Sequence, residues 1–139
     1  MNKFKEIRPI VLGILVRDNK LLITSGYDSK KNNTFYRCLG GGIEFQETST
    51  EALKREFKEE LNIDIKVGEF CGVYENIFIY EGNPAHEIVF LYKITIDDKD
   101  YKEEYKVIDE DNTYATWVDI NDFKTRKKII YPEGIIDYL

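Results

Sequence analysis

The stretch GGIEFQETSTEALKREFKEELNI, residues 41–63, decides the fold because it joins a glycine-rich segment to one amphipathic helix. Thr48 is followed three positions later by Glu51, which is the spacing of a capping box. Asn62 suits the left-handed conformation that ends a helix. The sequence therefore predicts a helix that begins at Thr48 and runs to about Leu61.

Three carboxylates gather beside the buried face of this predicted helix. At about 100° per residue, Leu53, Phe57 and Leu61 form one apolar stripe. A second stripe borders it and consists of Glu56, Glu59 and Glu60. Like charges three or four positions apart repel each other by about 0.2–0.5 kcal/mol per pair. The surplus negative charge favours a bound cation, and Mg²⁺ and Mn²⁺ prefer such oxygen ligands.

The spacing of the whole stretch separates this reading from an ordinary solvated helix, which is what a Glu- and Lys-rich helix most often is. Gly41 is followed by five residues, Glu47, seven residues, Arg55-Glu56 and then Glu59-Glu60. This pattern resembles the Nudix box, the signature of hydrolases that cleave nucleoside diphosphates linked to another moiety. The resemblance implies an α/β fold, the Nudix-type α/β/α sandwich with a mixed β-sheet.

The resemblance also implies roles for particular residues. It assigns the ligands of a divalent ion, Mg²⁺ or Mn²⁺, to Glu56, Glu59, Glu60 and the backbone carbonyl of Gly40. One glutamate would act as general base, with Glu56 and Glu59 both open. Arg55 would hold the box together through a salt bridge, with Glu47 as its expected partner, the alternative being an ordinary surface ion pair.

Substrate contacts are expected outside the helix. Gly41 allows close approach of backbone to phosphates, and Arg37 is a candidate for gripping a phosphate bidentately, the alternative being an exposed strand residue. Tyr36 is a candidate for stacking a base, although most aromatic residues belong to the core. In several relatives a carboxylate outside the box assists catalysis. Glu87 is the preferred candidate among four, which are Glu87, Glu103, Glu104 and Glu110.

Composition limits the partners. The chain has 139 residues, 42% of them hydrophobic, so we expect one domain spanning 1–139. The net charge of −6 would repel nucleic acid and anionic membranes, and no stretch approaches membrane-spanning length. Cys38 and Cys71 lack metal-ligand spacing, which fits a reduced, cytoplasmic protein. A single histidine, His86, leaves little material for a histidine-based metal site or a Ser-His-Asp triad.

The remaining chain reads mainly as strands. The apolar runs 10–16 and 21–24 predict a hairpin, and 34–40 predicts a short strand ended by three glycines. Further strands are expected within 63–80, 86–96 and 113–120, with a turn at 81–84. The polar segment 97–112 is expected to be a solvated loop.

Together these features predict a metal-dependent hydrolase that cleaves a phosphoanhydride bond in a small nucleoside-diphosphate-linked substrate. The alternative is a non-catalytic Nudix-fold module that senses a nucleotide, but such modules would be expected to lose box carboxylates. Capped RNA is disfavoured because the chain has no basic patch to track a polyanion. The aromatic-rich chain leaves room for a homodimer.

Overall fold

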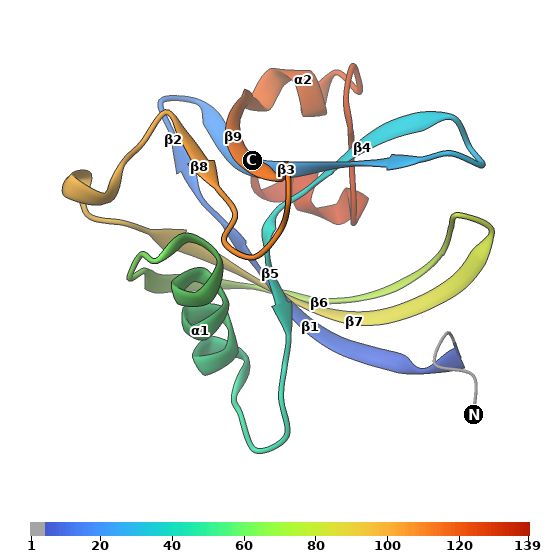
Figure 1. Cartoon of the computed structure of the whole chain (residues 1–139), viewed down its shortest axis with the longest axis horizontal. Coiled ribbons are helices and arrows are strands. Elements are labelled where there is room, and N and C mark those ends of the chain that lie inside the picture. The colour runs from blue at the N-terminus through green and yellow to red at the C-terminus, as the bar shows by residue number, and fades with distance from the viewer. Residues whose placement is uncertain (1–4) are drawn as a thin grey trace.

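The computed structural model describes residues 5–139, which fold as strands with few helices (Figure 1). The first half comprises β1 (Ile7–Ile14), β2 (Val16–Arg17), β3 (Lys20–Asp28), β4 (Asn33–Arg37), β5 (Leu39–Gly42) and α1 (Ser49–Leu61). The second half comprises β6 (Lys66–Tyr80), β7 (Asn83–Thr95), η2 (Asp98–Asp100), β8 (Glu104–Lys106), β9 (Tyr114–Asp119), α2 (Ile120–Lys124), β10 (Ile129–Ile130) and η3 (Glu133–Tyr138), where η marks a 3₁₀ helix. Within 5–139, no helix combines the length and the apolar composition needed to cross a bilayer.

The strands form two sheets with helices on both sides. One sheet has the order β5-β1-β7-β6, and the other has the order β10-β4-β3-β9-β8, with β2 added beside β3. β1 pairs parallel with β7 and antiparallel with β5. Because side chains of a strand alternate between faces, Val11 packs with Leu53 and Phe57 of α1, whereas Leu12 packs with Phe123 of α2. This confirms the predicted α/β fold with mixed sheets.

Helix α1 forms as its sequence predicts. The Thr48 hydroxyl accepts a hydrogen bond from the backbone N–H of Glu51 at 3.2 Å, and the Glu51 carboxylate accepts one from the Thr48 N–H at 3.0 Å. Asn62 ends the helix with a φ of 56°. Leu53 and Phe57 are fully buried. The capping box and the apolar stripe together fix which side of the helix faces solvent.

The predicted hairpin is shorter than expected. Asp18 and Asn19, both with positive φ, form the turn, but they connect only β2 to the start of β3. β1 instead leaves β3 and enters the other sheet between β5 and β7. The physical reason is that β1 is apolar on both faces, and such a strand is stable in the interior of a sheet.

The three glycines are the last residues of β5, so they end a strand as predicted, but the strand expected over 34–40 is divided between β4 in one sheet and β5 in the other. Gly40 pairs with Leu12, and Gly41 pairs with Val11. A Cβ atom on Gly40, whose φ is 152°, would lie 1.9 Å from the carbonyl oxygen of Val11. Only glycine fits this approach of two backbones. Gly40 thus allows the backbone of β5 to lie directly against that of β1.

The segment 97–112 is only partly the solvated loop that was predicted. Tyr105 and Val107 are buried at 2% and 1% exposure, and β8 pairs with β9. The backbone N–H of Ile108 donates to the Glu60 carbonyl at 2.8 Å, so this segment closes on the end of α1. Charged residues alternate here with apolar ones, which is the pattern of a half-buried strand rather than a loop.

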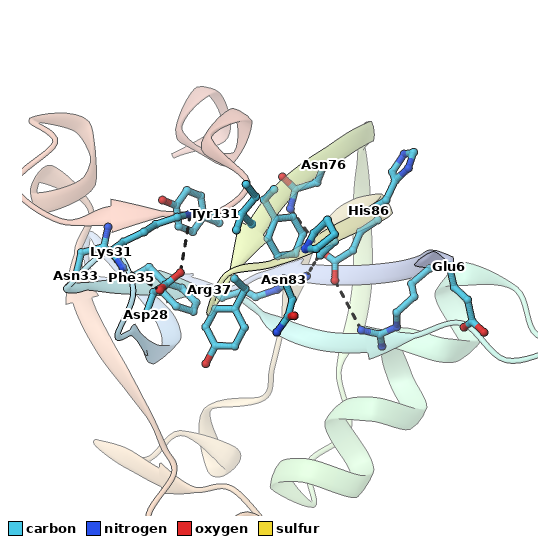
Figure 2. Close-up of a pocket in the computed structure, with 17 residues that line it drawn as sticks. Glu6, Asp28, Lys31, Asn33, Phe35, Arg37, Asn76, Asn83, His86 and Tyr131 are labelled. Atoms are coloured by element: carbon cyan, nitrogen blue, oxygen red, sulfur yellow. Dashed lines mark hydrogen bonds and ion pairs between the residues drawn. The ribbon is translucent and has the colours of Figure 1, made fainter. Parts of the chain in front are cut away.

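A cavity opens between the two sheets (Figure 2). It lies where the β3–β4 and β6–β7 hairpins extend side by side (Figure 1). The tips of these hairpins are bonded to each other. The Glu81 carboxylate accepts hydrogen bonds from the backbone N–H and the hydroxyl of Ser29, and the Glu81 N–H donates to Asp28 at 3.3 Å. These hydrogen bonds hold the tips of the two hairpins together.

Candidate active site

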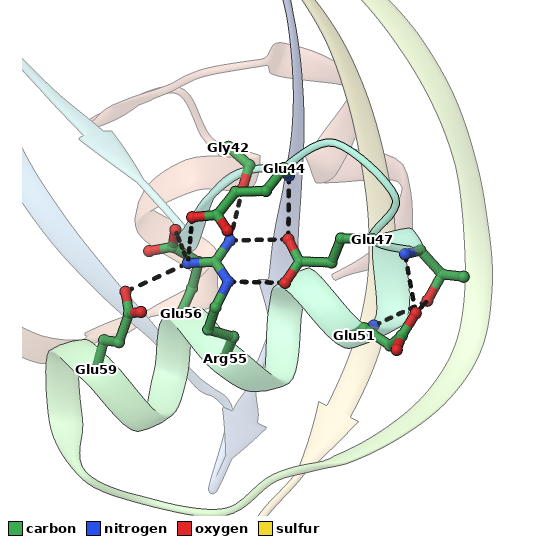
Figure 3. A network of polar contacts seen from close by, with 8 residues as sticks. Gly42, Glu44, Glu47, Glu51, Arg55, Glu56 and Glu59 are labelled. Carbon is green, nitrogen blue, oxygen red and sulfur yellow. Dashed lines mark hydrogen bonds and ion pairs between the residues drawn. The ribbon is translucent and has the colours of Figure 1, made fainter.

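Arg55 organises the loop between β5 and α1 (Figure 3). Its Nε and Nη2 donate to the two carboxylate oxygens of Glu47 at 2.7 and 2.9 Å, and Nη2 also donates to the Gly42 carbonyl at 3.0 Å. Its Nη1 donates to Glu56 at 3.0 Å and to Glu59 at 3.3 Å. The expected pairing of Arg55 with Glu47 is therefore present and is bidentate, the strongest form of such a contact.

The charges of this network shift the titration of its members. Hydrogen bonds from the Arg55 guanidinium, with help from the Glu44 N–H, lower the pKa of Glu47 to about 2. Glu47 and Glu56 in turn raise the pKa of Arg55 above its ordinary value. Glu47 is thus ionised throughout the physiological range.

An acidic cleft of about 230 Å³ lies beside this network, between β5, β7 and the end of α1. Six of the residues proposed from the sequence line it, namely Arg37, Gly40, Gly41, Glu60, Glu87 and Glu110. Glu56 borders the cleft, since its carboxylate lies against the backbone of Gly41. Residues that are far apart along the chain are thus brought to one place.

Glu60 is the carboxylate whose environment is least favourable to its charge. Burial raises its pKa to about 8, and the neighbouring Glu56, Glu110 and Glu59 add to the shift. Positive charge close to this cluster would offset the repulsion, so its donor set fits a divalent cation. Within residues 5–139, no three His, Cys, Asp or Glu side chains already converge as ligands.

Two predicted site residues lie away from the cleft. Glu59 is 60% exposed at its side chain and points toward Arg55. Tyr36 is half-buried and packs against the core, with its ring 5.8 Å from that of Phe123. Consecutive residues of a strand point to opposite faces, so β4 cannot present both Tyr36 and Arg37 to the same cavity. The expectation that Tyr36 stacks on a substrate does not match this placement.

Arg37 and Glu87, which were separate candidates in the sequence, form an ion pair between the two sheets. Arg37 Nη2 donates to Glu87 Oε1 at 2.7 Å, and Asn76 Nδ2 lies 3.4 Å from the same oxygen (Figure 2). Glu87 is only 5% exposed. The charge of Glu87 is thus compensated mainly by Arg37. The same ion pair holds the Arg37 guanidinium at the edge of the cleft.

Arg8 is a residue that sequence reasoning missed. Its Nη1 lies 3.9 Å from Glu87 Oε2, and it lines both the acidic cleft and the larger cavity. What would have identified Arg8 is the register in which β1 pairs with β7, because that register places Arg8 directly beside Glu87. That register is a property of the sheet and cannot be read from the sequence of β1.

The segment 97–112 contributes one further carboxylate. Glu110 lines the cleft close to Glu60, whereas Glu103 and Glu104 are exposed. Of the four carboxylates considered outside the box, Glu87 and Glu110 therefore reach the cleft. They enter it from different sides, Glu87 beside the arginines and Glu110 beside the end of α1.

Comparison with known proteins gives several matches. The family model of the NUDIX domain matches residues 7–137. ADP-ribose pyrophosphatase of Methanocaldococcus jannaschii is 42% identical over 67 residues, which are 46% of this chain and 37% of that protein. CTP pyrophosphohydrolase of Escherichia coli K12 is 32% identical over 66 residues, which are 48% of this chain and 49% of that protein. The matched part is thus less than half the length of either curated relative.

Solved structures agree with this fold. The MutT NUDIX hydrolase from Burkholderia pseudomallei superimposes with a TM-score of 0.63 at 20% identity, covering 84% of this chain and 86% of that one. The E. coli ORF135 protein gives a TM-score of 0.60 at 21% identity, covering 94% and 84%. The family match over nearly all of the sequence, together with the capped acidic helix beside a glycine strand, shows that the chain belongs to the NUDIX domain family.

Proposed function

We propose that this protein is a metal-dependent hydrolase that cleaves a phosphoanhydride bond in a small nucleoside-diphosphate-linked substrate. The observation that carries the proposal is the cleft itself, which the carboxylates of Glu60 and Glu110 line together with the guanidinium groups of Arg8 and Arg37. The Glu56 carboxylate lies at its border. The names of the two relatives, a pyrophosphatase and a pyrophosphohydrolase, support the same class of bond.

The metal would be held by Glu56, Glu59, Glu60 and the backbone carbonyl of Gly40. Bound there, Mg²⁺ or Mn²⁺ would offset the charge of the pyrophosphate and lower the pKa of the attacking water. Engaging the metal requires Glu59 to turn from its present contact with Arg55.

The protein groups supply orientation and proton transfer. Arg37 presents a planar guanidinium that matches the oxygens of a phosphate, and Gly40 and Gly41 let the phosphates approach the backbone of β5. We assign the role of general base to Glu56 in preference to Glu59, because Glu56 borders the cleft whereas Glu59 is largely exposed. Arg55 positions Glu56 through its hydrogen bond at 3.0 Å.

The shape and charge of the site favour a small molecule. The cleft is enclosed by two sheets and a helix end, and the chain carries a net charge of −6, so an extended nucleic acid would be repelled. We further propose that residues 1–139 act as one cytoplasmic domain, of which residues 1–4 lie outside the described part of the structure. Both cysteines are free and buried, which suits a reducing compartment.

A panel assay tests the proposed reaction. The purified protein with Mg²⁺ or Mn²⁺ is incubated with nucleoside triphosphates, oxidised nucleotides, ADP-ribose, dinucleoside polyphosphates and nucleotide sugars, and the products are separated by chromatography. The Glu59→Gln and Glu60→Gln proteins serve as blanks. Turnover by the wild type alone supports the proposal, whereas turnover of the same compound by all three proteins contradicts it.

The alternative function is a nucleotide-sensing module without catalysis. Both functions predict ligand binding, but only the hydrolase requires the acidic cleft to bind a cation. Mg²⁺ should therefore raise the melting temperature of the wild type, and Glu60→Gln should abolish this gain. A protein that is stabilised by nucleotides but equally stable with and without Mg²⁺ would favour the sensing module.

A further inference from the structure

β6 is the outermost strand of its four-stranded sheet and has a long free edge. β7 pairs with one side of β6 along residues 72–80, whereas no strand within residues 5–139 pairs with the other side. The irregular part of β6 lies before this stretch, between Val67 and Gly72. The β6–β7 hairpin extends beyond α1 as a curved ribbon (Figure 1). A regular, unpaired edge of this kind is a template for pairing with another strand.

The turn of this hairpin determines which backbone groups of β6 point outward. Glu81 and Gly82 both have positive φ, so they form a two-residue turn that a hydrogen-bonded pair, Tyr80 and Asn83, closes. Hydrogen-bonded and non-hydrogen-bonded pairs alternate along an antiparallel ladder. The N–H and C=O groups of the odd-numbered residues within 73–79 therefore point away from β7 and toward the free edge.

The same odd-numbered residues carry a row of exposed apolar side chains. Val73, Ile77 and Ile79 are 47%, 74% and 54% exposed. Glu75 is the only charged residue within 72–80, and this stretch contains no proline. Proteins usually protect a long edge with lysine, proline, a bulge or an inward-pointing charge. Residues 72–80 have little of this protection, so their surface suits contact with another strand.

The pattern of this edge is complementary to a second copy of itself. When two copies of β6 run antiparallel, a two-fold axis at Asn76 or Ile77 overlaps nearly all of residues 72–80. Both positions of the axis keep the apolar rows of the two copies on the same face. Glu75 then lies opposite the partner's Ile77 or the partner's Ile79, so the two carboxylates are not placed directly against each other. The net charge of the chain therefore does not prevent this contact.

The size of the contact predicts its strength. At about 3.4 Å per residue, the paired stretch 72–80 is about 30 Å long. The exposed parts of Val73, Ile77 and Ile79, together with the backbone edge between them, amount to on the order of 500 Å² on each copy, which is the size of a weak, reversible interface. The dissociation constant should therefore lie in the micromolar range.

We propose that two copies of this chain associate by pairing their β6 edges antiparallel, which joins their four-stranded sheets into one continuous sheet. β5, whose glycines line the acidic cleft, is the opposite edge strand of the same sheet. The cleft of each copy thus stays open in the dimer. The inference does not depend on the proposed hydrolase function.

Sedimentation velocity tests the association. The wild type is measured from about 1 to about 500 µM, which brackets a micromolar dissociation constant. We expect the fraction of dimer to rise with concentration. Ile77→Lys brings two like charges together near the two-fold axis and should raise the dissociation constant at least about tenfold. Because Ile77 is largely exposed, this variant should fold, and a circular dichroism melt checks that it does.

Ile7→Lys is the matched control. Ile7 is 59% exposed and lies on the same face of the same sheet, because Ile7 pairs with His86 and His86 pairs with Ile77. It belongs to β1, however, and is therefore two strands away from the free edge. Ile7→Lys should dimerise like the wild type. This comparison separates pairing along the edge from packing on the face of the sheet.

Cross-linking then locates the two-fold axis. For either position of the axis, the two copies of residue 77 lie opposite each other or on the diagonal, roughly 5–8 Å apart. A short bismaleimide reagent should therefore link Ile77→Cys into a covalent dimer and should leave Ile7→Cys largely monomeric. The wild type gives the background from Cys38 and Cys71, both of which are buried.

The outcomes decide the inference whether or not the protein hydrolyses phosphoanhydrides. A dimer that is lost in Ile77→Lys, kept in Ile7→Lys and trapped by Ile77→Cys supports it. A wild type that stays monomeric up to about 500 µM would overturn it and leave this edge to a strand of another protein. Equal dimerisation of the two lysine variants, or equal cross-linking of the two cysteine variants, would also overturn it.

Discussion

The carboxylate of Glu56 occupies the space that a side chain at Gly41 would fill. A Cβ atom on Gly41 would lie 2.4 Å from the Glu56 carboxyl carbon and 2.6 and 2.7 Å from its two oxygens. This contact joins β5 to α1 and sets the carboxylate at the border of the acidic cleft. The glycine and the glutamate therefore form one structural unit, although fifteen positions separate them.

Gly41→Ala tests this unit. The backbone of Gly41 does not require a positive φ, and a carboxylate at the end of a side chain can turn aside, so the variant should fold. Glu56 would then leave its place, and we expect hydrolysis to fall by about tenfold or more. Gly42→Ala is the matched control, because the nearest atom to its Cβ is 3.8 Å away. Equal rates of turnover for the two variants would contradict the role given to Gly41.

Arg55→Lys tests the bidentate network. Lysine keeps the charge but cannot span both oxygens of Glu47 while also reaching Glu56. We expect a loss of about 2 kcal/mol in the free energy of unfolding, measured with urea, together with weaker binding of Mg²⁺. Lys54→Ala, at an exposed neighbouring position, should change neither quantity. An Arg55→Lys protein with wild-type stability and Mg²⁺ affinity would show that the bidentate contact between Arg55 and Glu47 is not required for either property.

The pair formed by Arg37 and Glu87 should be coupled energetically. Arg37→Ala leaves a carboxylate of 5% exposure with Arg8 as its nearest cation, at 3.9 Å. We expect a loss of about 1–3 kcal/mol in the free energy of unfolding. A double-mutant cycle with Glu87→Gln should return a coupling energy of about 0.5–3 kcal/mol.

An exposed ion pair provides the reference for that cycle. Arg126 and Glu133 lie 3.8 Å apart, and both are about two-thirds exposed. Arg126→Ala should cost less than about 1 kcal/mol, as is usual for surface pairs. If the two arginine variants lost equal stability, the pair between the sheets would not have the importance given to it here.

The raised pKa of Glu60 predicts how the metal-free protein responds to pH. A carboxyl group whose pKa rises from 4.5 to about 8 on folding binds its proton more tightly in the native state. Its contribution to stability is thus greatest below pH 4.5 and is lost as the pH rises through about 8. Glu60→Gln stays neutral, so in EDTA it should gain stability over the wild type across this range.

Urea unfolding at several pH values measures this difference. The gap between Glu60→Gln and the wild type should be small at pH 5 and should widen toward pH 8 and above. Glu104→Gln removes one carboxylate charge at an exposed position and is the matched control for the substitution itself. A constant gap for Glu60→Gln would mean that its carboxyl group is not destabilised by burial.

Local sequence predicted α1 and its network closely. The cap at Thr48, the end at Asn62 and the pairing of Arg55 with Glu47 all depend on residues within one short segment, where spacing fixes geometry. Helical periodicity also placed Glu60 beside the buried stripe. These features could be predicted because they need no knowledge of which strands become neighbours.

The other half of the site could not be predicted in this way. Arg8, Arg37 and Glu87 meet because β1 pairs with β7 and because the second sheet packs over them. Neither relationship is encoded locally. Alternation in β4 indicates that Tyr36 and Arg37 face opposite ways, but only the packed structure shows that Tyr36 is the residue that packs against the core.

Turnover measured as a function of Mg²⁺ concentration, for the wild type and Glu56→Gln, tests the central claim most directly. The account predicts no hydrolysis in EDTA, activity that rises and saturates with Mg²⁺ in the wild type, and a folded Glu56→Gln protein that stays at least about a hundredfold slower at every Mg²⁺ concentration. Hydrolysis that persists in EDTA, or a Glu56→Gln protein as fast as the wild type, would contradict the assignment of this acidic helix as the catalytic centre.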